Sequence, residues 1–78
     1  MTASGMLTRE NFWTHLYTKS LSVRGRLALC YVMFFVGDQD QIVLEDMSLI
    51  CGLDPSECSD WLDYFMESGH LRPEMRWS

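Results

Sequence analysis

The segment that decides the fold is LEDMSLICGLDPSECSDWLDYFME, residues 44–67. Gly52 is typical of a helix end, so the first eight residues predict a short helix that stops at Cys51. Asp54 and Pro55 are then typical of the N-cap and first position of a new helix, and Glu57 completes a capping box. The new helix directs one apolar stripe inward, formed by Cys58, Trp61, Leu62, Phe65 and Met66. Two helices joined by a tight turn are therefore the centre of the expected fold.

Two further helices are predicted before this pair. Thr8 is a suitable N-cap for the first, and Ser22 for the second. The second helix continues through the apolar run 27–36, which marks it as central to the core, and ends at Gly37.

Short strands complete the pattern. The β-branched Ile42 and Val43 predict a strand ahead of residue 44. Gly69 ends the last helix, and the segment 70–77, with a turn at Pro73 and Glu74, predicts a minimal β-hairpin.

With 78 residues the chain has room for one domain, expected over residues 8–78 after a flexible tail at 1–7. Its 47% hydrophobic content is generous for a small domain, so some apolar surface can serve a partner or a second copy, unless the core is simply rich. An aromatic stripe in the first helix either forms a homodimer interface or closes the core. It consists of Phe12, Trp13, Leu16 and Tyr17.

Several classes of protein do not fit the sequence. No apolar run approaches the roughly 20 residues that cross a bilayer, and no signal peptide is visible, so a cytoplasmic protein without membrane contact is expected. The three cysteines cannot all pair within one chain and read as buried thiols. A zinc site of Cys51, Cys58 and His70 matches no ligand spacing, so no metal or cofactor is expected. Neither His15 nor His70 has a catalytic partner at motif spacing, which argues against an enzyme.

Residues 44–63 resemble the helix-turn-helix motif of DNA-binding proteins. The matching positions, in chain order, are Met47, Ser48, Cys51, Gly52, Leu53, Cys58 and Trp61. With the preceding helix and the ending ESGHLRP, residues 22–73 look like a winged helix, similar in pattern to phage and plasmid replication proteins and to small regulators of the MarR type. The resemblance implies a mostly α, small winged helix-turn-helix domain. It would have about four helices, the helix-turn-helix at 44–67 and a minimal C-terminal β-hairpin as the wing.

The same resemblance places Ser56, Ser59, Asp60 and Asp63 where such proteins face the major groove, yet the charges there are wrong for DNA. The stretch between Arg26 and Arg72 contains nine acids and no lysine or arginine, which gives it a charge of −9. Carboxylates beside phosphates repel the duplex. The outward positions of the last helix instead form a stripe that either binds a basic partner or is a solvated face. The stripe consists of Glu57, Asp60, Asp63, Tyr64 and Glu67.

The sequence thus favours a small intracellular regulator or inhibitor that docks this acidic stripe on a basic protein surface. The size would suit a protein encoded by a phage or mobile element. The alternative is a DNA-binding transcription or replication regulator that contacts phosphates through Arg24, Arg26, Arg72 and Arg76. A third reading is a domain of a longer protein.

Overall fold

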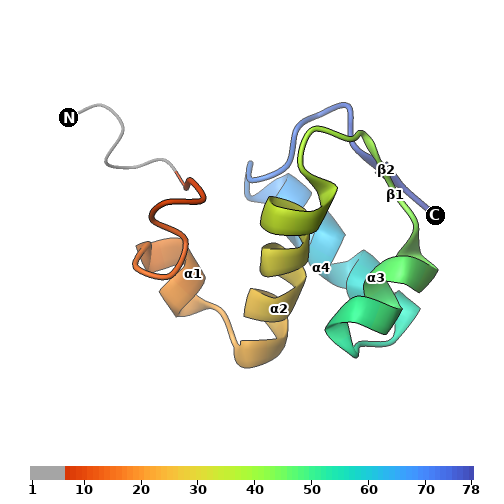
Figure 1. Cartoon of the computed structure of the whole chain (residues 1–78), viewed down its shortest axis with the longest axis horizontal. Helices are drawn as coiled ribbons and strands as arrows, with labels where there is room; N and C mark the ends of the chain where they lie inside the picture. Colours follow the sequence, from red (N-terminus) through yellow and green to blue (C-terminus); the bar gives the residue numbers. More distant parts are fainter. Residues whose placement is uncertain (1–6) are drawn as a thin grey trace.

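The computed structural model describes residues 7–78, and Figure 1 shows their path. The chain is mostly helical, with one pair of very short strands. The elements, in chain order, are α1 (Leu16–Ser20), α2 (Val23–Tyr31), the π-helical turn η2 (Val32–Val36), β1 (Gln41–Ile42), α3 (Leu44–Cys51), α4 (Pro55–Glu67) and β2 (Arg76–Trp77). Of the expected N-terminal tail, Leu7 packs against the core, and residues 1–6 lie outside the described residues.

The first helix is shorter than predicted. Thr8 and Asn11 exchange hydrogen bonds, since each backbone N–H donates to the other's side-chain oxygen (2.8 and 3.3 Å). The chain then continues in turns, because Phe12 folds into the core and His15 adopts an extended backbone. Helix α1 begins only at Leu16, with the Nδ1 atom of His15 accepting the N–H of Tyr17 (3.0 Å).

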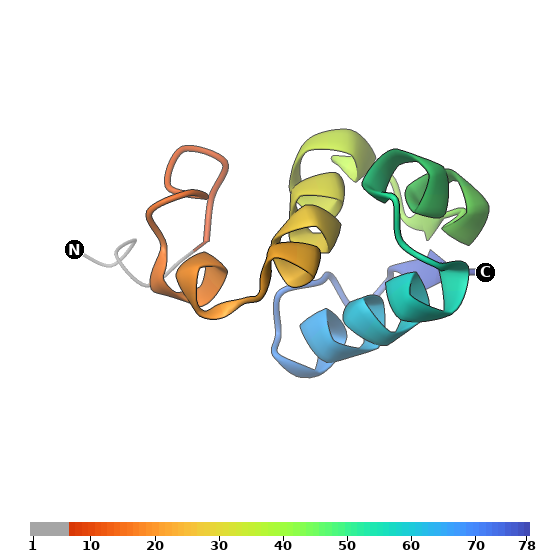
Figure 2. The same cartoon turned by 90° about the horizontal axis from the view of Figure 1, so that it is seen from below.

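Helix α2 is the central element, as the sequence predicted. Its N-cap Ser22 accepts the N–H of Gly25 (3.2 Å), and η2 continues it to Gly37, whose φ of 61° ends the helix. Figure 2 shows α2 between α1 on one side and the α3–α4 pair on the other. Ala28 and Leu29 of α2 are fully buried at this junction.

Helices α3 and α4 form the predicted pair around a tight turn. Gly52 has the left-handed φ of 73° that favours glycine, and Leu53 fills the corner with 3% of its surface exposed. The hydroxyl of Ser48 donates to the carbonyl of Leu53, which ties α3 to the turn. The capping box is wrong: Asp54 stands at the N-cap but its side chain makes no capping bond, and Glu57 turns to another helix.

The C-terminal segment forms no hairpin, which corrects the predicted wing. Strand β2 instead pairs in parallel with β1, in the register Gln41 to Arg76 and Ile42 to Trp77. Residues 70–72 stay irregular because Leu71 and Met75 are drawn into the core. Beyond β2, the N–H of Ser78 donates to Ile42, and its carbonyl accepts the N–H of Leu44 at 2.9 Å.

The core lies where the helices meet. Its largest fully buried side chains come from the turns before α1, from β1 and from helices α1 to α4: Phe12, Thr18, Leu29, Ile42, Met47, Cys58, Leu62 and Phe65. No helix within residues 7–78 has the length and apolar character that crossing a bilayer requires.

Candidate functional site

The outer side of α4 carries carboxylates that have no ion-pair partner among residues 7–78. Asp60, Asp63 and Glu67 are exposed, and none of them forms an ion pair with any residue in 7–78. Neighbouring acids on one helix face repel one another, so this arrangement does not help the helix to form. Tyr64 lies beside them with 46% of its surface exposed. We call Asp60, Asp63, Tyr64 and Glu67 the acidic face.

Glu57, which the sequence grouped with this face, has a different role. The guanidinium of Arg24 donates to both of its carboxylate oxygens, at 2.7 and 2.8 Å, and so joins α2 to α4. The indole N–H of Trp61 donates to the same carboxylate at 3.2 Å. The hydrogen bond from Arg24 is the main reason that the pKa of Glu57 lies below its usual value. Its charge is therefore largely balanced within the protein.

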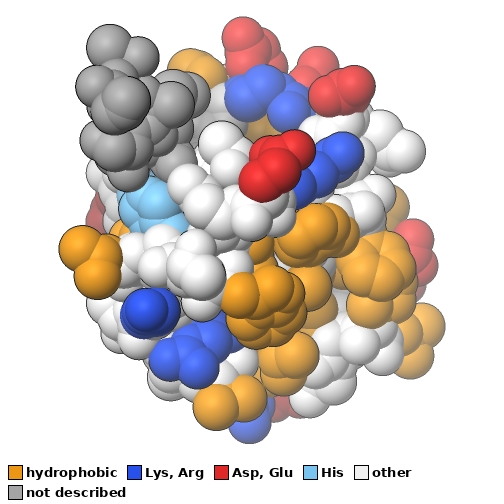
Figure 3. Space-filling view, turned by 60° about the vertical axis from the view of Figure 1, so that its left-hand side comes forward, with side chains coloured by type: hydrophobic (Ala, Val, Ile, Leu, Met, Phe, Trp, Pro, Cys, Tyr) orange, Lys and Arg blue, Asp and Glu red, His pale blue; other side chains and the backbone are white. Residues whose placement is uncertain are grey.

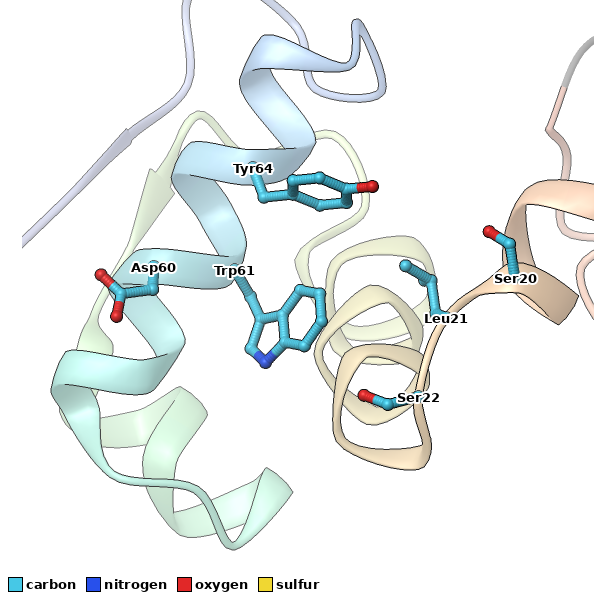
Figure 4. A pocket seen from close by; sticks show the side chains of 6 residues that line it. All are labelled: Ser20, Leu21, Ser22, Asp60, Trp61 and Tyr64. Carbon is cyan, nitrogen blue, oxygen red and sulfur yellow. The ribbon is translucent and has the colours of Figure 1, made fainter.

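A groove opens between α4 and the junction of α1 with α2 (Figure 4). Its volume is about 410 Å³. The rings of Trp61 and Tyr64 point across it towards Leu21, whereas the carboxylate of Asp60 at its rim points outward (Figure 4). The remaining lining residues are Ser20 and Ser22. We call this feature the Trp61–Tyr64 groove.

The indole of Trp61 is held in place on several sides. It stacks on Phe65, with ring centroids 5.8 Å apart, and meets Tyr64 edge to face at 5.9 Å. A Cβ atom added at Gly25 of α2 would come within 2.7 Å of the ring, so only glycine fits beneath it. The sequence predicted that Trp61 faces the core. The side chain is only half-buried and forms a wall of the groove, because Gly25 leaves it room at the edge of α2.

The arginines of the DNA-binding alternative are engaged within the protein. Beside the Arg24–Glu57 pair, Arg26 donates to the carbonyls of Thr18 and Lys19 at the end of α1. The other two hold the C-terminal segment. Their acceptors are Gly37, Gln39 and Asp40 for Arg72, and Pro73 and Met75 for Arg76.

The aromatic stripe, predicted either to form a dimer interface or to close the core, is split between the core and the surface. Phe12 is fully buried and is unavailable to a partner, and Tyr17 stacks on His70 with ring centroids 3.8 Å apart. Only Trp13 and Leu16 project outward, with 65% and 81% of their surfaces exposed. Figure 3 shows that exposed hydrophobic side chains gather on one face of the molecule.

The thiols are poorly suited to act as nucleophiles at neutral pH. Burial raises the pKa of Cys30 and Cys58, and it raises that of Cys51 to about 11, so all three stay protonated. Burial also lowers the pKa of His70. Across residues 7–78 no three potential metal ligands come together.

Comparisons with known proteins provide no further guide. No family model matches the chain, and no significant match was found among the curated proteins or the solved structures.

Proposed function

We propose that the protein is a small intracellular regulator or inhibitor that acts by binding a basic protein surface through the acidic face of α4. The observation that carries this proposal is that the acidic side chains of α4 and the candidate arginines differ in how far they are engaged within the protein. Asp60, Asp63 and Glu67 are exposed and unpaired among the described residues, whereas the four candidate arginines are bonded within the chain. Charge of one sign on one face steers a partner of the opposite sign.

We also infer that the fold is a reduced winged helix. The support is the tight turn between α3 and α4, preceded by α2 and by a strand that pairs with the C-terminal segment. The wing would be reduced to the single strand β2. In winged helices that read DNA the second helix of the pair enters the groove, and the acidic face of α4 is suited to a protein instead.

The experiment that tests the function is capture from a lysate of the source cells, followed by binding measurements with each purified partner. We expect a retained protein with a basic surface, whose affinity falls as salt rises because the contacts are charged. A partner that binds equally well at high salt, or one without a basic surface, would contradict the proposal.

Binding to DNA provides a separate test. We expect the protein to bind a duplex no tighter than roughly 1 µM at physiological salt, the upper range of non-specific binders, because acids dominate α4. Fluorescence anisotropy with a labelled duplex measures this. Nanomolar binding to one sequence, abolished by Asp60→Ala, would favour a DNA-binding regulator instead.

Self-association through the exposed part of the stripe is a further prediction. Since Trp13 and Leu16 are largely exposed, we expect the wild type to reach twice the chain mass in light scattering at high concentration. Trp13→Ala should return it to the monomer with an unchanged circular dichroism spectrum. Leu49→Ala removes a side chain of α3 that is even more exposed than Trp13, and it should leave the mass unchanged. A monomer at every concentration would exclude the dimer.

A further inference from the structure

The Trp61–Tyr64 groove has the chemistry to receive a cation. The faces of Trp and Tyr rings carry negative potential and attract ammonium and guanidinium groups. Asp60 lines the rim with its carboxylate turned outward (Figure 4), and it takes no part in the ion pair that occupies Glu57. A long basic side chain could therefore lie in the groove with its apolar stem along the rings and extend its charge over the rim towards Asp60.

Hydrogen bonding within the groove points to the same ligand. The indole N–H of Trp61 is committed to Glu57, and the hydroxyl of Ser20 donates to the carbonyl of Tyr17 at 2.6 Å. The oxygens of Ser20 and Asp60 remain able to accept. These acceptors suit a group rich in N–H donors, and guanidinium and ammonium are the charged side-chain groups of that kind.

We propose that the Trp61–Tyr64 groove binds one arginine side chain of the protein partner. This inference rests on the proposed function, since it names the residue that the basic partner inserts beside the acidic face. Arginine fits better than lysine because its guanidinium is planar, stacks on aromatic rings and loses less hydration. The nearby Arg24 is balanced by Glu57, so it opposes such a guest weakly.

The test uses a blocked pentapeptide with one arginine between glycines, and matched peptides with lysine or with uncharged citrulline. The chain has three tryptophans, and Trp61→Phe identifies the indole N–H signal of Trp61 in a nitrogen-correlated NMR spectrum. We expect the arginine peptide to shift this signal saturably. The citrulline peptide should bind at least about threefold more weakly, since it lacks the cation.

Variants locate the binding within the groove. Asp60→Asn and Tyr64→Ala should each weaken the arginine peptide by roughly threefold or more, whereas Tyr64→Phe keeps the ring and should bind like the wild type. Asp63→Asn lies outside the groove lining and should also bind like the wild type. An unmoved Trp61 signal, or equal binding of the citrulline peptide, would overturn the inference.

The outcomes of these experiments distinguish a failure of the inference from a failure of the proposed function. If charge reversal at Asp63 and Glu67 abolishes binding of a captured basic partner while Tyr64→Ala does not weaken it, the acidic face is the binding surface and the groove is not. If the arginine peptide binds the groove but every captured partner is insensitive to salt and to charge reversal, the proposed function fails, and the inference about the partner's arginine fails with it.

Discussion

Replacing Phe65 by alanine is expected to lower the free energy of unfolding by about 3–5 kcal/mol, the usual cost of removing a buried ring. Phe65 is fully buried in α4 and contacts the rings of Tyr17, Trp61 and Tyr64. Proteins are stable by only about 5–15 kcal/mol, so this variant should lose a large share of its stability. Urea denaturation followed by circular dichroism measures the change.

Leu49→Ala is the matched control, because it also removes a large apolar side chain from a helix. Leu49 is 83% exposed, and we expect a change within about 0.5 kcal/mol. If Phe65→Ala proved as mild as Leu49→Ala, the packing of Phe65 against Tyr17 of α1 and within the core would be contradicted.

Reversing the charge of the acidic face should have the largest effect on binding. We expect the double variant Asp63→Lys and Glu67→Lys to slow association with a basic partner by roughly 10- to 1000-fold at low salt, the range attributed to electrostatic steering. Stability should hold or rise slightly. The two lysines repel each other as the two acids did, but the repulsion between Asp60 and Asp63 becomes an attraction, and a cation near the C-terminal end of α4 suits the helix dipole. Surface plasmon resonance at two salt concentrations measures the association rates. Thermal melts of the same samples measure the stability.

The control variant must change the net charge of the protein by the same amount, at positions outside the acidic face. Glu10→Lys with Glu74→Lys does so, because both residues are exposed and lie outside α4. Each pair of substitutions raises the net charge from −5 to −1, since every acid-to-lysine change adds two. Equal slowing by the two pairs would show that total charge matters and that the acidic face does not.

Local signals in the sequence were sufficient to predict where helices α3 and α4 begin and end. Gly52 and Pro55 act through their own backbone restrictions, so their effect needs no knowledge of distant residues. The predicted capping box failed because Glu57 is bound by Arg24, which lies 33 positions earlier in the chain. The predicted hairpin failed for the same kind of reason. Strand β2 found its partner in β1, and no turn signal near Pro73 could indicate a pairing across that distance.

For the candidate site, the sequence predicted the acidic stripe but missed the groove. The stripe follows from helical periodicity alone, and Asp60, Asp63 and Glu67 are exposed as predicted. The groove depends on where the α1–α2 junction lies against Trp61, and on the bare surface of Gly25 beneath the ring. From the sequence alone, a glycine inside a helix indicates only a position that lowers the stability of the helix. Only the three-dimensional structure shows that the indole ring of Trp61 packs directly on Gly25.

The position of β2 decides how the protein should be attached to a support or fused to another chain. The backbone of Ser78 bonds to Ile42 and to Leu44, so a rigid fusion placed directly after it would pull on the strand beside the start of α3. Helix α1 lies at the opposite end of the molecule from β2 (Figure 1). An affinity handle ahead of α1, joined by a flexible glycine-serine linker, leaves that strand pairing undisturbed.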